Sequence, residues 1–210
     1  MIICGDSLME EQQTFQFANG GSIPTSPLQF KVIEIDKYLA QNLNEKWHSR
    51  LPVYKTGFCL NSLVSYGLYY DGFIYGIAIW TNPVSASLPQ HEWLELRRMA
   101  LCPDIPKNTA SRMLSVMRRL IIKKFPHVTK LISYQDSVVH RGIIYKAAGW
   151  KIGCYHKGGS WNRPNAKNLN GKPRTRPDNN KAVGPKIRWE KDINKRNPNS
   201  PTGMTARRSR

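Results

Sequence analysis

The sequence predicts an α/β fold: a mixed β-sheet with helices on both faces, followed by a basic, partly disordered C-terminal extension. An early pair of strand-like segments joined by Asp71-Gly72 indicates an antiparallel hairpin. From Leu94 to Trp150, strand-like and helix-like segments alternate, which is typical of parallel strands linked by helices. With 210 residues, 40% of them hydrophobic, the chain can bury one substantial core.

The N-terminal elements follow from local patterns. Residues 1–27 are polar, contain Gly20-Gly21, and are expected to be weakly ordered. Residues 28–35 alternate between apolar and polar side chains and predict a strand. Asp36 is placed to cap a helix that runs to about His48.

Three further strands precede the long helix. Residues 62–70 and 73–81 are rich in β-forming side chains, and Gly72 between them accepts the backbone conformation that a tight turn needs. A Pro- and Ser-containing loop then leads to a strand at 93–101. These segments predict an antiparallel hairpin followed by a further strand.

The next helix is predicted from Asn108 or Thr109, either of which can cap it, to about Phe125. Apolar side chains recur at spacings of three and four, and they are Met113, Leu114, Met117, Leu120 and Ile121. This spacing gives one apolar face for packing on the sheet.

The remaining elements are short. Residues 130–135 predict a buried strand, 138–148 a helix closed by Gly149, and 150–156 another strand. After residue 158 the composition shifts to Asn, Pro, Lys and Arg. We therefore predict a folded domain over 28–158 and an extension over 159–210, ordered only near 186–190 and disordered from about 194.

The charge distribution predicts a phosphate-rich partner. Of 32 Lys and Arg against 14 Asp and Glu, residues 156–210 hold 15 basic and 3 acidic side chains. Nucleic acid is the commonest such partner, although a solvated tail without a specific partner would look the same. No apolar run approaches a membrane span, and no secretion signal begins the chain. Four scattered cysteines without a Cys-x-x-Cys pair fit a reducing cytoplasm.

Two resemblances join these elements to an activity. The order of elements over about 28–156, with Tyr145-Lys146-Ala147-Ala148-Gly149-Trp150 at the end of a helix, resembles the GNAT-type acyltransferase fold. In place of that fold's glycine-rich diphosphate loop stands 106–112. Short motifs also resemble the phage Mom-type DNA modification proteins: Trp47-His48-Ser49, Leu96-Arg97-Arg98, Pro106 to Ser111, Ser133-Tyr134-Gln135-Asp136 and Gly142 to Tyr145.

The Mom-type resemblance implies that the 28–158 domain is catalytic and modifies the exocyclic amine of adenine in phage DNA. The modification is of a carbamoylmethyl type and protects the DNA from host restriction. The candidate catalytic residues are His48, Ser133, Tyr134, Asp136 and Tyr145. His48 or Asp136 would accept a proton, Ser133 or Tyr134 would stabilise an oxyanion, and Tyr145 would be the general acid. Each also has a structural interpretation, for example Asp136 as a helix cap and Tyr145 as a core aromatic.

The donor is expected to be acyl-CoA or another activated compound, and the sequence identifies neither it nor a metal. The predicted anion seat comprises Arg98, Lys107, Asn108, Thr109, Ser111 and Arg112. Backbone N–H groups at the start of a helix would bind a diphosphate there, and Arg98 would add a forked contact. A plain helix cap explains the same residues without a ligand.

Candidate DNA contacts are cations interleaved with tryptophans: Trp161, Arg163, Lys172, Arg174, Arg176, Lys186, Arg188 and Trp189. Tryptophan beside arginine can stack on an extruded base, although Trp189 could equally dock the tail on the domain. Two other functions fit the sequence, namely an ordinary acyl-CoA N-acyltransferase acting on a protein or small amine, and a non-enzymatic nucleic-acid-binding protein. The target sequence and the oligomeric state remain open.

Overall fold

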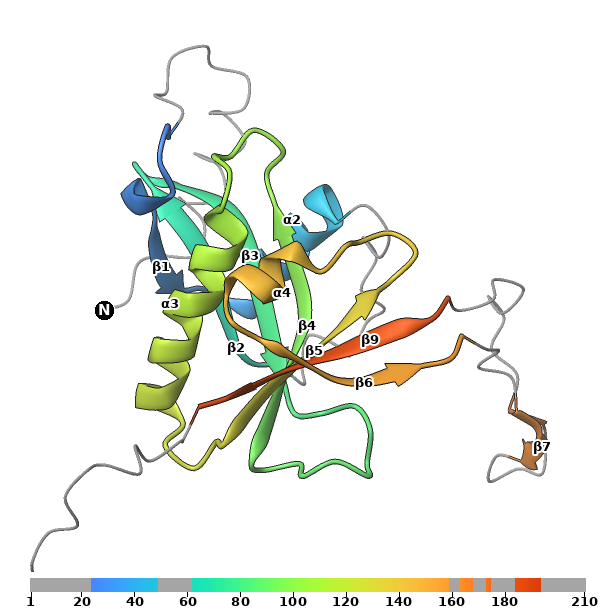
Figure 1. The fold of residues 1–210 in the computed structure, drawn as a ribbon. Coiled ribbons are helices and arrows are strands. Elements are labelled where there is room, and N and C mark those ends of the chain that lie inside the picture. The colour runs from blue at the N-terminus through green and yellow to red at the C-terminus, as the bar shows by residue number, and fades with distance from the viewer. Residues whose placement is uncertain (1–23, 49–61, 159–162, 168–172, 175–183, 194–210) are drawn as a thin grey trace, which may run out of the picture.

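A computed structural model describes residues 24–48, 62–158, 163–167, 173–174 and 184–193. Seven strands form one mixed sheet in the order β1-β2-β3-β4-β5-β9-β6 (Figure 1). They are β1 (Lys31–Glu34), β2 (Ser62–Tyr70), β3 (Phe73–Thr81), β4 (Trp93–Leu101), β5 (Lys130–Asp136), β6 (Lys151–His156) and β9 (Lys186–Asp192). Among the described strand pairs of this sheet, β4–β5 is parallel and the others are antiparallel.

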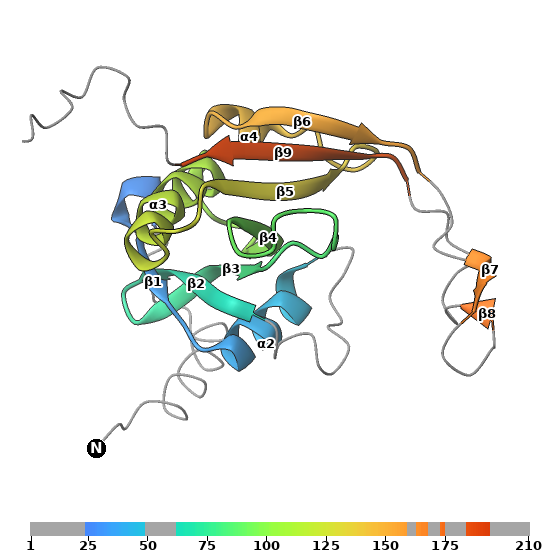
Figure 2. The same cartoon turned by 90° about the horizontal axis from the view of Figure 1, so that it is seen from below.

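Helices cover both faces of the sheet, as predicted (Figure 2). Helix α2 (Lys37–Trp47) packs on β2, β3 and β4 through an apolar cluster that includes Leu43 and Ile77. Helices α3 (Thr109–Lys124) and α4 (Ile143–Ala147) lie on the opposite face, over the larger cluster. The predicted cap of α2 is present, because Asp36 Oδ1 accepts from the N–H groups of Tyr38 at 2.7 Å and Leu39 at 3.2 Å.

The hairpin between β2 and β3 forms at the predicted turn. Asp71 and Gly72 both have positive φ, at 47° and 86°, and Tyr70 pairs with Phe73 across the turn. Two consecutive positive φ values match the twist of the two strands, which is why Asp-Gly is favoured there. The first predicted strand is shorter than expected, because a 3-10 turn, η1 (Pro27–Gln29), precedes β1.

The parallel strands β4 and β5 pair over only part of their lengths. Trp93 to Leu96 face Lys130 to Ser133 in register, and neither strand pairs with the other beyond these residues. Figure 1 shows the two strands diverging towards their carboxyl ends. In a parallel pair the carboxyl ends are a usual place for ligands, because backbone groups released from the ladder become available. The candidate site therefore begins at Leu96 and Ser133, the last residues that pair between the two strands.

Strand β9 corrects the predicted domain boundary. It lies between β5 and β6 and runs antiparallel to both, so the sheet continues beyond residue 158. The side chain of Trp189 is buried at 2% exposure in the larger cluster, and Ile193 is buried beside it. The segment at 186–190 is thus not an ordered piece of a separate extension. It is an interior strand of the domain.

The predicted helix at 138–148 is wrong in its first half. Residues 137–139 form a turn, residues 140–142 have no regular structure, and the helix in this stretch is Ile143–Ala147. Asp136 Oδ1 accepts from the N–H of Val138 at 3.0 Å, and Gly142 adopts a left-handed φ of 69°. A residue with positive φ ends helical geometry, so the chain enters α4 only after Gly142.

The rest of the tail is described only in part. A two-stranded sheet, β7 (Arg163–Lys167) with β8 (Pro173–Arg174), was not predicted. The predicted weak order before residue 24 and disorder from about 194 lie outside the described residues. Across the described ranges, no helix is both long and apolar enough to cross a membrane.

Gly142 is a position where we expect substitution to be costly. A Cβ there would lie 2.6 Å from Trp189 Cζ2 and would also meet Gln135 Oε1. Gly142→Ala therefore adds a clash to the cost of about 1–2 kcal/mol for positive φ. Gly72→Ala is the matched control, because Gly72 has positive φ with nothing within 4 Å. Urea unfolding should show the larger loss for Gly142→Ala, and equal losses would contradict tight packing at this position.

Candidate active site

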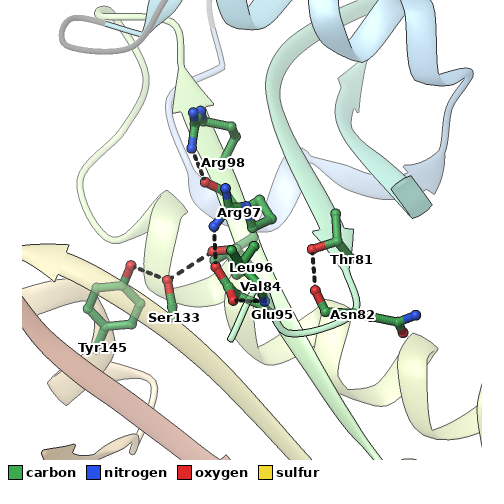
Figure 3. Close-up of polar contacts among 9 residues, drawn as sticks. All are labelled: Thr81, Asn82, Val84, Glu95, Leu96, Arg97, Arg98, Ser133 and Tyr145. Atoms are coloured by element: carbon green, nitrogen blue, oxygen red, sulfur yellow. Dashed lines mark hydrogen bonds and ion pairs between the residues drawn. The ribbon is translucent and has the colours of Figure 1, made fainter. Parts of the chain in front are cut away.

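The centre of the site is a hydroxyl pair where β4 and β5 separate. Ser133 Oγ lies 2.9 Å from Tyr145 Oη and donates to the carbonyl of Leu96 at 3.3 Å (Figure 3). A serine hydroxyl has one proton, so its bond to Leu96 leaves Tyr145 as the donor in the hydroxyl pair. Strand β5 positions Ser133, and the turn at Gly142 positions Tyr145 on α4.

Aromatic packing fixes the ring of Tyr145. The ring stacks on Trp189 with centroids 5.4 Å apart and planes at 14°, and it meets Trp150 edge-on at 5.6 Å. Burial raises the pKa of Tyr145, and the hydrogen bond with Ser133 opposes that rise. The hydroxyl therefore stays protonated near neutral pH and is available as a proton donor.

Gln135, which was not predicted as a site residue, connects Trp189, the stacking partner of Tyr145, to the loop after β5. It is buried at 4% exposure; its Oε1 accepts from Trp189 Nε1 at 2.6 Å and its Nε2 donates to the carbonyl of His140. Gln135 lies two residues after Ser133, so both point to the same face of the strand. The two-residue spacing from Ser133 could have placed Gln135 on the same face of the strand. The sequence does not show, however, whether a single polar residue in a strand is buried.

Within β4, a buried carboxylate holds one of two neighbouring arginines. Glu95 is 2% exposed and accepts from Arg97 Nη1 at 2.6 Å and from the N–H of Val84 at 2.9 Å. Arg98 Nη1 donates to the carbonyl of Arg97 at 2.8 Å (Figure 3). Glu95 was not predicted as a site residue. The signal for it was an acidic side chain in an otherwise apolar stretch of strand.

His48 and Arg98, predicted separately, lie near one another. His48 forms the C-cap of α2, and its pKa is lowered to about 4 by burial, then by the charges of Arg98 and His140. The imidazole is consequently neutral at pH 7. It can accept a proton, although as a weaker base than an ordinary histidine.

The lowered pKa of His48 predicts an unusual pH profile. We expect no fall in kcat/KM near pH 6.5 on account of this residue, because His48 stays neutral to about pH 4. The unfolded chain takes up the proton near its ordinary pKa of about 6.5. Between these values the unfolded state binds more protons, so stability falls as pH decreases from about 6.5 to about 4. Thermal melts of His48→Asn should show a smaller fall, and an equal fall would contradict the shift.

Tyr134 and Asp136 point to the other face of β5. Burial raises the pKa of Tyr134, and a hydrogen bond from Arg188 opposes the rise. Asp136 caps the turn at Val138, as its structural interpretation predicted, and pairs in register with Lys186 of β9. Because side chains alternate along a strand, Tyr134 and Asp136 do not join the hydroxyl pair of Ser133.

The predicted anion seat divides into two parts. Thr109 and Arg112 serve the fold: Thr109 is buried and its hydroxyl donates to Pro106 O at 2.7 Å, while Arg112 Nη1 donates to Phe30 O at 3.1 Å. Ser111 Oγ donates to Asn108 O at 3.0 Å, and Asn108 has a left-handed φ of 68° instead of a side-chain cap.

The other part of the seat faces solvent. Lys107 and Asn108 are exposed at the start of α3. Within the described structure, the N–H groups of Ala110 and Ser111 in the first turn have no backbone acceptor. Free N–H groups at a helix start, with a lysine beside them, suit an anionic group.

The candidate DNA contacts are distributed over described and undescribed segments. Trp161, Lys172 and Arg176 lie outside the described residues, and Arg163 pairs in register with Arg174 in the β7–β8 sheet.

In β9 the structure corrects one of these predictions. Trp189 is buried and bonded to Gln135, so its ring cannot stack on a base, and it docks the strand instead. Arg188 makes an ion pair with Glu190 at 2.7 Å. Burial and the charge of Arg97 lower the pKa of Lys186. In the described part of the chain, no group of three or more His, Cys, Asp or Glu side chains could hold a metal ion.

Sequence comparison identifies relatives of the chain. The model of the Mom protein family matches residues 29–197, which include β9. The protein named methylcarbamoylase mom, from Escherichia phage Mu, is 27% identical over 131 residues. That alignment covers 58% of this chain and 52% of the phage Mu protein, so the chain spans about half the length of this relative.

Solved structures show the same fold. The ribosomal-protein-S18-alanine N-acetyltransferase from Escherichia coli has a TM-score of 0.54 at 14% identity, with 82% of this chain and 99% of that chain covered. A GNAT-family acetyltransferase from Streptococcus pneumoniae has a TM-score of 0.50 at 11% identity, with 78% and 99% covered. The predicted GNAT-like sheet with helices on both faces is therefore confirmed.

Proposed function

The chain belongs to the Mom protein family, and from that premise we propose that it transfers a carbamoylmethyl-type group to the exocyclic amine of adenine in DNA. In phage DNA this modification would protect against host restriction. The observation that carries the chemistry is the buried hydroxyl pair of Ser133 and Tyr145 where β4 and β5 separate. A group-transfer reaction needs a proton donor for its leaving group, and a tyrosine kept protonated by burial can supply one.

The proposed step forms one bond and breaks another. The adenine amine nitrogen attacks the transferred carbon of the donor, and the bond from that carbon to the leaving group breaks. The nitrogen loses a proton to a base, while Tyr145 gives a proton to the leaving group. Because the amine lone pair is delocalised into the adenine ring, the amine is a poor nucleophile, and close positioning must contribute much of the rate.

Two side chains are available as the base. Neutral His48 lies near Arg98, and the carboxylate of Asp136 lies at the end of β5. His48 is a weaker base than an ordinary histidine, since its pKa is lowered to about 4. Asp136 lies at the carboxyl end of β5, on the face opposite Ser133, and His48 lies at the end of α2; the variants described below test Asp136 directly.

The donor is proposed to be acyl-CoA or another activated compound with an anionic part. Lys107 and the N–H groups of Ala110 and Ser111 at the start of α3 would hold a phosphate of the donor. Arg112 and Thr109 would act indirectly, by fixing the position of α3. The partner is double-stranded DNA, which the net charge of +18 favours.

The test is mass spectrometry of nucleosides from the DNA of cells that express the protein. We expect a new adenosine derivative with the wild type and its loss with Asp136→Asn. Asparagine keeps the oxygen that caps Val138, so this variant removes the charge of Asp136 without removing the turn. The amount of folded protein is measured in parallel, so that a loss of product is not a loss of enzyme.

An unchanged nucleoside profile with abundant folded wild type would overturn the proposal. The remaining functions would then be N-acylation of a protein or small amine, or binding of nucleic acid without chemistry. A modified base that persists in Asp136→Asn would keep the reaction and assign the base to His48.

A further inference from the structure

The loop between β5 and α4 exposes aliphatic side chains at the edge of the candidate site. Val138 is 72% exposed, Val139 39% and Ile143 63%, and all three lie within six residues of one another. Val138 and Val139 lie on the loop, and Ile143 begins α4 directly after it. Single exposed aliphatic side chains are common on proteins, whereas exposed apolar patches mark contact surfaces. Figure 1 shows this loop projecting from the end of β5 before it turns back to α4.

Hydrogen bonds hold the loop in place despite its exposure. At its start, Asp136 accepts from the N–H of Val138 at 3.0 Å, and its carbonyl accepts from the N–H of His140 at 3.0 Å. Ser137 donates through both its N–H, at 3.2 Å, and its hydroxyl, at 2.8 Å, to the carbonyl of Pro185. The hydrogen bonds therefore hold the two valines on a preorganised loop. Inserting their side chains into a binding partner then costs little conformational entropy.

The loop is also directly connected to the proposed chemistry. It follows Asp136, its His140 is close enough to His48 to lower the pKa of that imidazole, and His140 O accepts from Gln135. At its far end, Gly142 lies against Trp189, which stacks on Tyr145. An object that contacts Val138 and Val139 would therefore lie beside Asp136, one of the two candidate bases.

We propose that Val138, Val139 and Ile143 form an apolar wedge that enters the DNA duplex and fills the space left by the extruded adenine. This inference rests on the proposed function. Chemistry on an amine inside a duplex requires the base to leave the stack, and an inserted apolar side chain replaces part of the lost stacking. The exposed Arg141 between the valines and Ile143 is placed to contact a backbone phosphate.

The double variant Val138→Ser/Val139→Ser tests the wedge with two forms of one DNA. The substrate is a plasmid, supplied either as duplex or after heat denaturation, and the product is modified adenosine measured by mass spectrometry. We expect modification of the duplex to fall by about tenfold or more, and modification of the denatured DNA to stay within about twofold, because single strands need no extrusion. Exposed valines contribute little to the fold, so the variant should remain native.

Leu28→Ser is the matched control. Leu28 is 76% exposed, comparable with Val138, but it lies beside β1 at the opposite end of the sheet order from β6. We expect this variant to modify both DNA forms as the wild type does. Equal losses on duplex and denatured DNA in the double variant, or no loss on the duplex, would overturn the wedge. If the wild type modifies neither form of the DNA, the proposed function itself fails. Failure of the wedge is a different result, because it is seen only when the variant is compared with an active wild type.

Discussion

A chain that ends at Lys195 is expected to unfold at the temperature of the full-length protein, whereas a chain that ends at Val183 is expected not to fold. The second truncation removes β9, and with it the backbone hydrogen bonds to both β5 and β6. It also removes the buried Trp189 and Ile193 and the ion pair between Lys130 and Glu190 at 2.7 Å. Losing a buried tryptophan alone costs about 3–5 kcal/mol, against a total stability of about 5–15 kcal/mol.

Circular dichroism melts of the two truncated chains measure this difference. Trp189→Phe is the milder companion variant, since phenylalanine keeps a ring to stack on Tyr145 but leaves Gln135 Oε1 without its indole donor. We expect a loss of about 1–3 kcal/mol from that unsatisfied acceptor. A cooperative melt of the chain ending at Val183 would show that β9 is dispensable. Tests of the tail in DNA binding should therefore cut after residue 193 and not at 158.

Tyr145→Phe is expected to lower kcat by about 10²–10⁴-fold while the melting temperature changes little. The variant removes the proton donor but keeps the ring between Trp189 and Trp150. Ser133 Oγ retains its bond to Leu96 O, so no buried hydroxyl is left without a partner. Single-turnover formation of modified adenosine, measured by mass spectrometry, separates this chemical step from DNA binding.

The companion variant Ser133→Ala distinguishes proton donation from packing. It keeps the Tyr145 hydroxyl but removes the oxygen 2.9 Å away, so a buried donor loses its partner at a cost of about 1–3 kcal/mol in stability. We expect partial activity from Ser133→Ala and almost none from Tyr145→Phe. Full activity in Tyr145→Phe would make Tyr145 a core aromatic and leave the acid to be found elsewhere.

Local patterns predicted most elements, because hairpin turns, helix caps and helical periodicity depend on residues that are close together in the sequence. Asp71-Gly72 and Asp36 formed the turn and the cap expected of them. The prediction of a helix over 138–148 was wrong in its first half, although the residue pattern there is helical. Asp136 caps a turn at Val138, and Gly142 has a positive φ that interrupts helical geometry. Strand β9 could not be placed, since its pairing with β5 joins residues as far apart in the sequence as Lys130 and Asp192.

The site was predicted as a set of residues but not as an arrangement. The sequence marked Ser133 and Tyr145 separately, and only the fold brings their hydroxyls into contact. Glu95 and Gln135 were missed because burial of a polar side chain depends on neighbours that are distant in the sequence. Trp189 was assigned to DNA since an aromatic beside an arginine fits either role, and packing decides between them.

The place of β9 in the sheet sets the order in which a newly made chain can fold. Until Asp192 has left the ribosome, β5 and β6 lack the strand that lies between them, and each has an unpaired edge. Unpaired strand edges template association with other chains, and such long-range pairing forms slowly. Folding of this half of the sheet must therefore wait until β9 has been synthesised, and during that interval the nascent chain is most exposed to aggregation and most dependent on chaperones.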